Sequence, residues 1–143
     1  MKIAIGADHG AFERKATVIE HLSKKGYEVK DFGTYTPDSC DYPAIGRAVA
    51  NAVASGEFDR GIVMCTTGIG ISIVANKVKG IRCALCSDIT SARLTRQHND
   101  ANMLSFGAGI VGPNLSLDII DTFLTTEFSN EEKHVRRISQ IEE

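Results

Sequence analysis

The chain has 143 residues and a formal net charge of −2, with 43% hydrophobic and 24% charged residues, as in globular proteins. This composition excludes intrinsic disorder. The chain has no apolar run near the ~20 residues of a transmembrane helix, and its mild acidity argues against binding to nucleic acid. The first nine residues have no long apolar stretch typical of a signal peptide, so we expect one cytoplasmic domain over residues 1–143.

Short apolar runs alternate with segments of helical periodicity along the chain. The expected strands cover residues 2–7, 27–32, 61–65, 81–86 and 102–106. Helices are expected at 12–22, 45–53, 70–78, 90–98 and 115–124, with Gly26, Gly56 and Gly80 after the first three. Ser129 and Glu132 have the spacing of a capping box before a last helix at about 130–141.

This alternation indicates βαβ units and therefore a parallel sheet with both faces covered. We expect an α/β fold: a doubly wound, Rossmann-like sheet of five parallel strands with helices on both faces, which makes a three-layer sandwich. Ligands of such folds bind beyond the carboxyl ends of the strands, near the switch in strand order. Residues 8–10, residues 65–70 and the segment after the fifth strand are therefore the candidate positions for a site.

The clearest chemical signal is the stretch from Cys65 to Ser72, where a thiol ends an apolar strand before a glycine-containing turn and a helix. Glycines let the backbone approach a ligand, and amides at a helix start can hold an anion. The same dipole favours thiolate over thiol. Such a thiolate can attack as a nucleophile or abstract a proton beside a held oxyanion. The alternative is a buried core cysteine before a structural turn.

Other polar segments have both a functional and a structural interpretation. Asp8 and His9 end the first strand, where an Asp often only caps a helix, and residues 98–100 form a polar helix end that could simply be solvated. Cys83 and Cys86 have the spacing of one ligand pair of a four-ligand zinc site. They lie inside a strand, and the chain has no second pair, so we expect no metal.

Cations gather near the end of the chain. Lys133 and Arg137 are four residues apart and share a helix face, with Arg136 close to that face. They suit either a solvated surface or a phosphate group, if this helix lies over a pocket.

Together these segments resemble the ribose-5-phosphate isomerase B family, which includes the galactose-6-phosphate and allose-6-phosphate isomerases. The resemblance runs essentially end to end, and it is carried by the order and spacing of several motifs. These are residues 5–10, 41–43, 65–77, 80–82, 96–102 and 133–137.

The resemblance implies a metal-free aldose–ketose isomerase without a cofactor, which interconverts ribose 5-phosphate and ribulose 5-phosphate through a cis-enediolate. In that family Cys65 matches the base, Thr67 and His98 match positions that open the sugar ring, and the amides of residues 66–70 match the oxyanion hole. The substrate-binding positions implied are Asp8, His9, Tyr42, Thr66, Gly68, Ile69, Gly70, Ser72, Asn99, Lys133, Arg136 and Arg137.

The resemblance also implies a homodimer, with a tetramer as the alternative. In the family's homodimer, residues 98–99 of each site come from the partner chain, and the C-terminal helix packs on the partner.

Three positions depart from the family pattern: Thr66 stands where glycine is usual, Lys133 replaces an arginine, and Gly109 replaces a phosphate-binding arginine. These departures favour, as an alternative substrate, a six-carbon sugar phosphate or another aldose.

Two other classes of protein share the expected fold. A phosphoacceptor signalling domain would have an aspartate where Cys65 stands, and a flavin or nucleotide-binding module would have its phosphate loop after the first strand.

Overall fold

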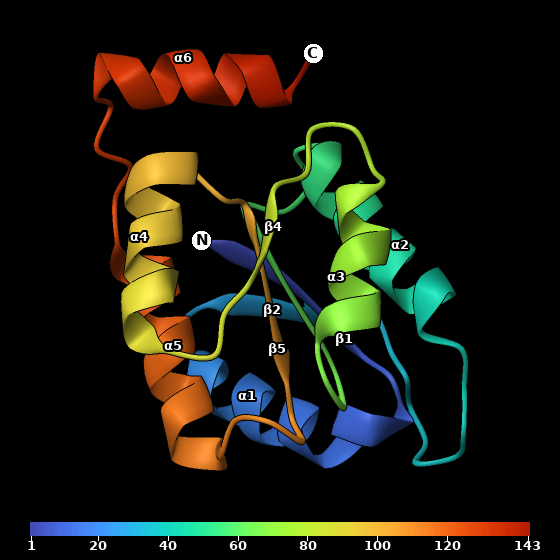
Figure 1. Ribbon diagram of the computed structural model, residues 1–143. Helices are drawn as coiled ribbons and strands as arrows, with labels where there is room; N and C mark the ends of the chain where they lie inside the picture. Colours follow the sequence, from blue (N-terminus) through green and yellow to red (C-terminus); the bar gives the residue numbers. More distant parts are fainter.

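The computed structural model describes residues 1–143 as a five-stranded parallel sheet with helices on both faces (Figure 1). The strands are β1 (Lys2–Ala7), β2 (Glu28–Asp31), β3 (Arg60–Cys65), β4 (Cys83–Leu85) and β5 (Met103–Gly107). The helices are the short η1 (His9–Ala11), then α1 (Phe12–Lys24), α2 (Tyr42–Ala54), α3 (Ile69–Asn76), α4 (Ile89–Asn99), α5 (Pro113–Thr125) and α6 (Glu132–Ile141). The expected fold class is confirmed.

Most element ends agree with the sequence to within three residues. Gly26 and Gly56 follow the C-cap residues of their helices with positive φ, as expected. Gly80 does not close the third helix, because α3 already ends at Asn76 with Lys77 as its C-cap. The fourth strand is shorter than residues 81–86, because the side chain of Asn102 accepts from Arg82 N at 2.9 Å and donates to Gly80 O at 2.8 Å in place of a ladder.

The expected capping box at the start of α6 is wrong. Glu131 is the N-cap residue, and no side chain caps the helix. Ser129 Oγ instead donates to Gln97 O at 2.8 Å, so it ties the preceding segment to α4. None of the helices is both long and apolar enough to cross a membrane.

The strand order is β2-β1-β3-β5-β4, so the direction of winding changes between β1 and β3. Asp8 directly follows β1, and Cys65 is the last residue of β3. The two segments therefore flank the switch point, where side chains and backbone amides can reach a ligand at the carboxyl edge.

Two apolar clusters hold the layers together. Under α1 and α5, Ile3, Ile62 and Phe106 meet Phe123 with no exposed surface. Under α2 and α3, smaller side chains such as Ala4 and Val63 let the helices pack close to the strands. The alternation of strand residues between the two clusters follows from the period of two, and it fixes the register of the sheet.

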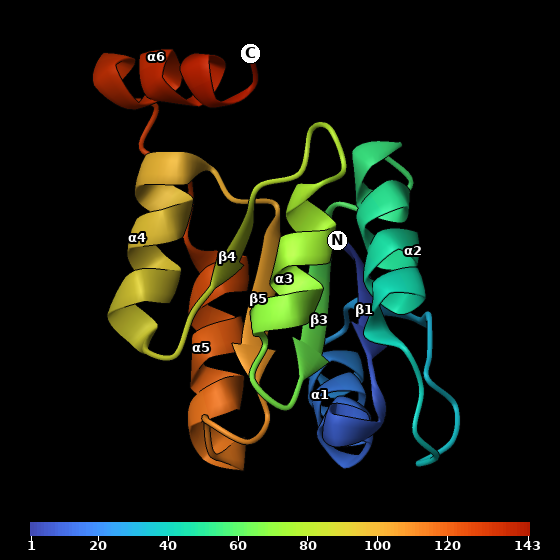
Figure 2. The same cartoon turned by 45° about the vertical axis from the view of Figure 1, so that its right-hand side comes forward.

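Helix α6 lies apart from the sheet, across the end opposite to the strand arrowheads (Figure 2). It packs on the end of α4. Arg82 holds the other end of α6, because its guanidinium donates to Glu142 Oε1 at 2.5 Å while bonding the carbonyls of Asn99 and Asp100.

Candidate active site

Cys65 lies at the carboxyl end of β3, and it is buried. Its Sγ accepts a hydrogen bond from Gly68 N at 3.1 Å. Gly68 has a φ of 75°, which turns the chain back over the sulfur before α3 begins. The thiol is thus fixed just before the start of a helix, with a backbone N–H directed at its sulfur.

The loop that follows this thiol contains further backbone amides. The N–H of Ile69 is bonded to Thr67 Oγ1 at 3.2 Å. The N–H groups of Thr66, Thr67 and Gly70 have no hydrogen-bond partner in the chain. Unpaired amides at the start of a helix are suited to hold a developing negative charge, as the expected oxyanion hole requires.

The loop of residues 66–70 packs directly on β5. A Cβ on Gly68 would lie 2.5 Å from Phe106 C, and a Cβ on Gly107 would lie 2.5 Å from Thr67 C. Ser105 Oγ donates to Gly68 O at 2.7 Å from a fully buried position. Sequence reasoning missed Ser105, because it lies on β5, whereas the loop that it holds follows β3.

Asp8 and Tyr42 approach the same loop from its two sides. Asp8 is buried, and its Oδ1 accepts from Gly10 N at 2.9 Å, which is the capping role left open by the sequence. Tyr42 lies against the first turn of α3, since a Cβ on Gly70 would lie 2.5 Å from its hydroxyl oxygen.

His9 lies next to Asp8 on the exposed rim. Its Nδ1 accepts from Cys40 N at 3.2 Å, which ties it to the loop before α2. Ser72 differs from these residues, because it is buried in α3 and its Oγ donates to Ile69 O at 2.7 Å.

Two of the departures from the family pattern touch each other. Thr66 stands between Gly10 and Gly109, with its Oγ1 against Gly10. A Cβ on Gly109 would lie 3.0 Å from both Thr66 Cγ2 and Thr66 O. A side chain at position 109 would therefore be in tight contact with the methyl group and the backbone carbonyl of Thr66.

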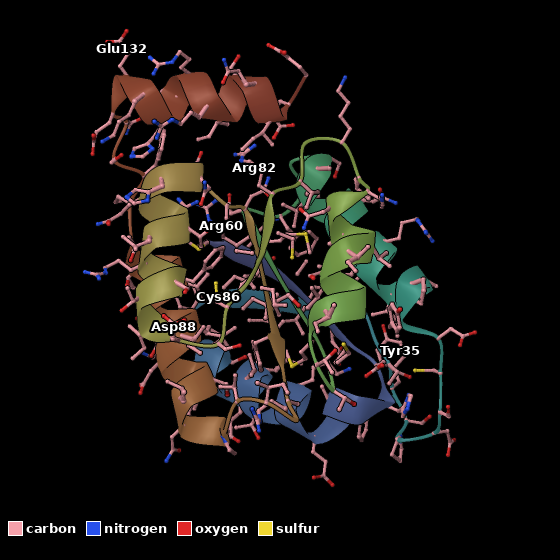
Figure 3. All side chains as sticks on the ribbon, viewed as in Figure 1. Tyr35, Arg60, Arg82, Cys86, Asp88 and Glu132 are labelled. Atoms are coloured by element: carbon pink, nitrogen blue, oxygen red, sulfur yellow. The ribbon has the colours of Figure 1, made fainter.

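The remaining expected site residues lie at the other end of the molecule. His98 and Asn99 end α4, and Lys133, Arg136 and Arg137 lie on α6. In Figure 3, α4 runs from Asp88 at the carboxyl edge of the sheet toward α6.

One chain therefore does not bring His98 to Cys65. The strand β5 begins just after α4, and its Met103 is paired with Gly61, whereas Cys65 is paired with Gly107. At about 3.3 Å per residue, four steps along β3 separate these ends by roughly 13 Å.

His98 has a partner that spacing did not predict. Its ring stacks on that of His134, with centroids 4.4 Å apart and planes 16° from parallel. Burial, and next the charge of His98, lower the pKa of His134. The position of His134 in the sequence indicates no role for it. The pair is seen only in the packing of α6 on α4.

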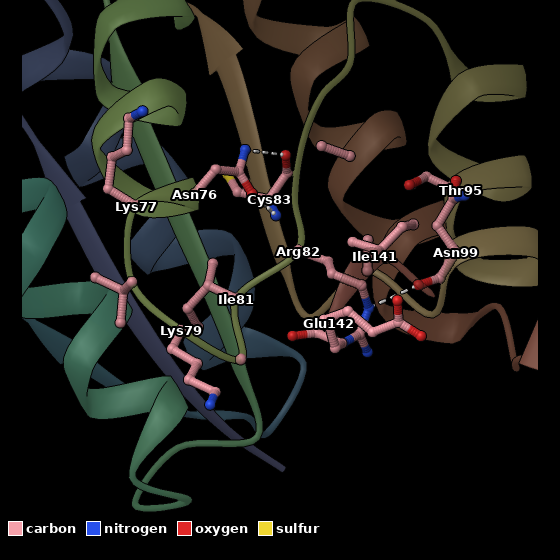
Figure 4. A pocket seen from close by; sticks show the side chains of 15 residues that line it. Asn76, Lys77, Lys79, Ile81, Arg82, Cys83, Thr95, Asn99, Ile141 and Glu142 are labelled. Atoms are coloured by element: carbon pink, nitrogen blue, oxygen red, sulfur yellow. Dashed lines mark hydrogen bonds and ion pairs between the residues drawn. The ribbon is translucent and has the colours of Figure 1, made fainter. Parts of the chain in front are cut away.

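A cavity of about 660 Å³ opens at this second end (Figure 4). Asn99, Arg82 and Lys77 line it together with the last residues of α6. It also contains Cys83, whose thiol pKa burial raises to about 12. Cys86 belongs to the apolar cluster on the opposite face of the sheet, so the two cysteines do not form half of a zinc site.

In a doubly wound α/β protein, a fixed thiol and free amides at the switch point have the chemistry to stabilise an anionic intermediate on a small ligand. Known proteins identify this class more closely. The family model for ribose/galactose isomerases matches residues 3–141. The ribose-5-phosphate isomerase B of Escherichia coli is 46% identical over 140 residues, which cover 98% of this chain and 93% of that protein.

Solved structures agree with this assignment. Ribose-5-phosphate isomerase B from Clostridium thermocellum is 54% identical, with a TM-score of 0.97 over 99% of this chain and 95% of the other. The enzyme from Thermotoga maritima is 48% identical, with a TM-score of 0.96 over 99% and 97%. The chain belongs to the ribose/galactose isomerase family, and it is an aldose–ketose isomerase.

Proposed function

We propose that this isomerase interconverts ribose 5-phosphate and ribulose 5-phosphate, with Cys65 as the base and without a metal ion. The observation that carries the proposal is the Cys65 sulfur beside Gly68 N, with unpaired amides in the same loop. Relatives at 46% and 54% identity that are named for ribose 5-phosphate support this choice of substrate.

The reaction follows from that geometry. The Cys65 thiolate takes the proton from C2 of the open-chain aldose, and the electron pair forms the C1–C2 double bond while charge collects on O1. The free amides of Thr66, Thr67 and Gly70 stabilise this enediolate. The thiol then returns the proton to C1 as the proton on O2 passes to O1, which gives the ketose and restores the thiolate.

We infer that the site is completed by a second copy of the chain. His98 and Asn99 would then come from the partner to open the sugar ring and contact the substrate, with Thr67 acting from the first chain. Lys133, Arg136 and Arg137 of the partner's α6 would face the phosphoryl group. Support comes from the separation of these two groups of residues within one chain.

Exposed apolar side chains beside the thiol loop suit such an interface. Ile69 and Ile73 on α3 are 50% and 54% exposed, and Leu85 on the edge strand is 42% exposed. On α6, Val135 and Ile141 are also exposed. These surfaces fit a self-complementary contact in which α6 packs on the partner.

An isomerase that depends on a reduced thiol fits a reducing compartment, and all four cysteines are free. We therefore place the enzyme in the cytoplasm, acting as one domain over residues 1–143.

A panel assay tests the substrate assignment. Ribose 5-phosphate, allose 6-phosphate, galactose 6-phosphate and the unphosphorylated sugars are compared by kcat/KM. We expect ribose 5-phosphate to give the highest value. A higher value for a six-carbon sugar phosphate would overturn that assignment in favour of the alternative suggested by Gly109.

A further inference from the structure

Arg14, on the first turn of α1, carries a cation to the carboxyl edge of the sheet. Its Nη1 donates to Val111 O at 2.7 Å, and its Nη2 donates more weakly to Ala108 O at 3.4 Å. These two carbonyls lie on either side of Gly109 in the chain. The guanidinium is therefore anchored on the same segment from which the family's phosphate-binding arginine would extend.

No carboxylate neutralises this guanidinium. Arg14 is absent from every ion pair in the chain, whereas Arg82 and Arg96 each contact an acidic side chain. Partial burial lowers the pKa of Arg14, which shows that water solvates its charge incompletely. Since a guanidinium has five N–H donors and two carbonyls are bonded, donors remain for an anion.

Arg14 lines a cavity of about 390 Å³ whose wall is made by the segment after β1, the start of α1 and the segment after β5. His9, Gly10 and Ala108 line the same cavity, and Gly10 contacts Thr66. Ala108 N also donates to Cys65 O at 2.9 Å, so a single residue joins the cysteine to the arginine. Glu13 is the one carboxylate on the cavity wall.

We propose that Arg14 binds the phosphoryl group of the substrate, in place of the arginine that this chain lacks at position 109. The family's cation is thus supplied from α1 instead of from the loop after β5. This inference rests on the proposed function, because it requires a phosphorylated sugar whose reacting carbons lie at Cys65.

Kinetics of two Arg14 variants test the proposal. Arg14→Gln keeps an amide donor for the carbonyls but loses the charge, and Arg14→Lys keeps the charge. We expect Arg14→Gln to raise both KM for ribose 5-phosphate and the inhibition constant of inorganic phosphate about tenfold, with kcat within about twofold. Arg14→Lys should recover most of this loss.

Lys24→Gln is the matched control, since it removes an exposed cation at the far end of the same helix, paired only with Glu20. It should change neither constant. If Arg14→Gln lowers kcat but leaves the inhibition constant of phosphate unchanged, Arg14 only holds the segment around Gly109, and the proposal is overturned.

Calorimetric titration with inorganic phosphate separates this proposal from the proposed function. If the wild type converts no phosphorylated sugar but binds phosphate, and Arg14→Gln weakens that binding about tenfold, the anion site stands while the substrate assignment fails. If the wild type is active on ribose 5-phosphate and Arg14→Gln binds phosphate as well as the wild type does, the anion site is wrong while the enzymatic function stands.

Discussion

Thr66 and Gly109 show how one substitution constrains another. The methyl and carbonyl groups of Thr66 occupy the space around the Cα of Gly109, with 3.0 Å left to a Cβ there. A glycine at position 66 would remove the methyl contact. The two departures from the family pattern are therefore in contact in the folded chain.

Gly109→Arg should thus be tolerated only together with Thr66→Gly. We expect the single variant to unfold at a lower temperature, because overpacking typically costs ~1–3 kcal/mol, and the double variant to recover most of that loss. Thermal unfolding of both variants and of Thr66→Gly measures the coupling between the two positions. Additive effects would contradict the contact.

Ser105 holds the thiol loop through its bond to Gly68 O. Ser105→Ala should lower kcat about tenfold or more, because the loop amides lose their fixed position, while stability falls by ~1 kcal/mol. Ser116 is the matched control: it is equally buried, and its Oγ donates to Pro113 O at 2.6 Å, in α5. Ser116→Ala should lower stability alone. Equal effects of both variants on kcat would contradict the role of Ser105.

At the scale of elements, the contact between α4 and α6 depends on the stacked rings of His98 and His134. The pKa of His134 is lowered in the folded chain, so the unfolded chain binds its proton more readily. This contribution to stability is absent above the ordinary histidine pKa of about 6.5 and becomes unfavourable as the pH falls through it.

NMR titration of the histidines measures this effect. We expect His134 to titrate below the usual range, and its pKa to rise in His98→Phe, which keeps an aromatic ring but removes the neighbouring charge. The protection factors of the α6 amides, which are corrected for the intrinsic exchange rate at each pH, should fall from pH 7.5 to 5.5 by the same argument. A pKa of His134 that His98→Phe leaves unchanged would show that the two rings do not interact electrically.

The sequence predicted the elements well where the determinants are local. Apolar periodicity located the strands, and Gly26 and Gly56 marked helix ends, whereas α3 ends at Asn76, before Gly80. The prediction failed where a distant partner decides the outcome: Asn102 shortens β4, and Gln97 takes the hydroxyl of Ser129 that a capping box would need.

At the scale of the whole molecule, the thiol and the amide loop at Cys65 could be predicted to lie together, because one short segment supplies both. The contacts of Arg14 and His134 could not be predicted, because their partners are far along the chain and meet them only after folding. The resemblance supplied the roles of His98 and Asn99, but the structure adds that one chain keeps them away from Cys65.

Hybrid assemblies test the shared site. Cys65→Ala and His98→Ala subunits should each be inactive alone. After subunit exchange, a hybrid dimer has one site with both residues intact, so mixing should restore up to about a quarter of wild-type activity if the chains mix at random. Exchange is checked with differently tagged chains. No recovery after confirmed exchange would indicate a site built from one chain.

The most direct test of the central claim, that Cys65 moves the proton between C2 and C1, is isomerisation of ribose 5-phosphate in D₂O by the wild type and by Cys65→Ala. Wild-type turnover should place solvent deuterium on the carbon that receives the proton, because the thiol exchanges with water. Cys65→Ala, with its fold verified by circular dichroism, should lose turnover and deuterium incorporation together, by about a thousandfold or more. A variant that keeps more than about a tenth of wild-type kcat, a loss of less than ~1.4 kcal/mol, would contradict the assignment of Cys65.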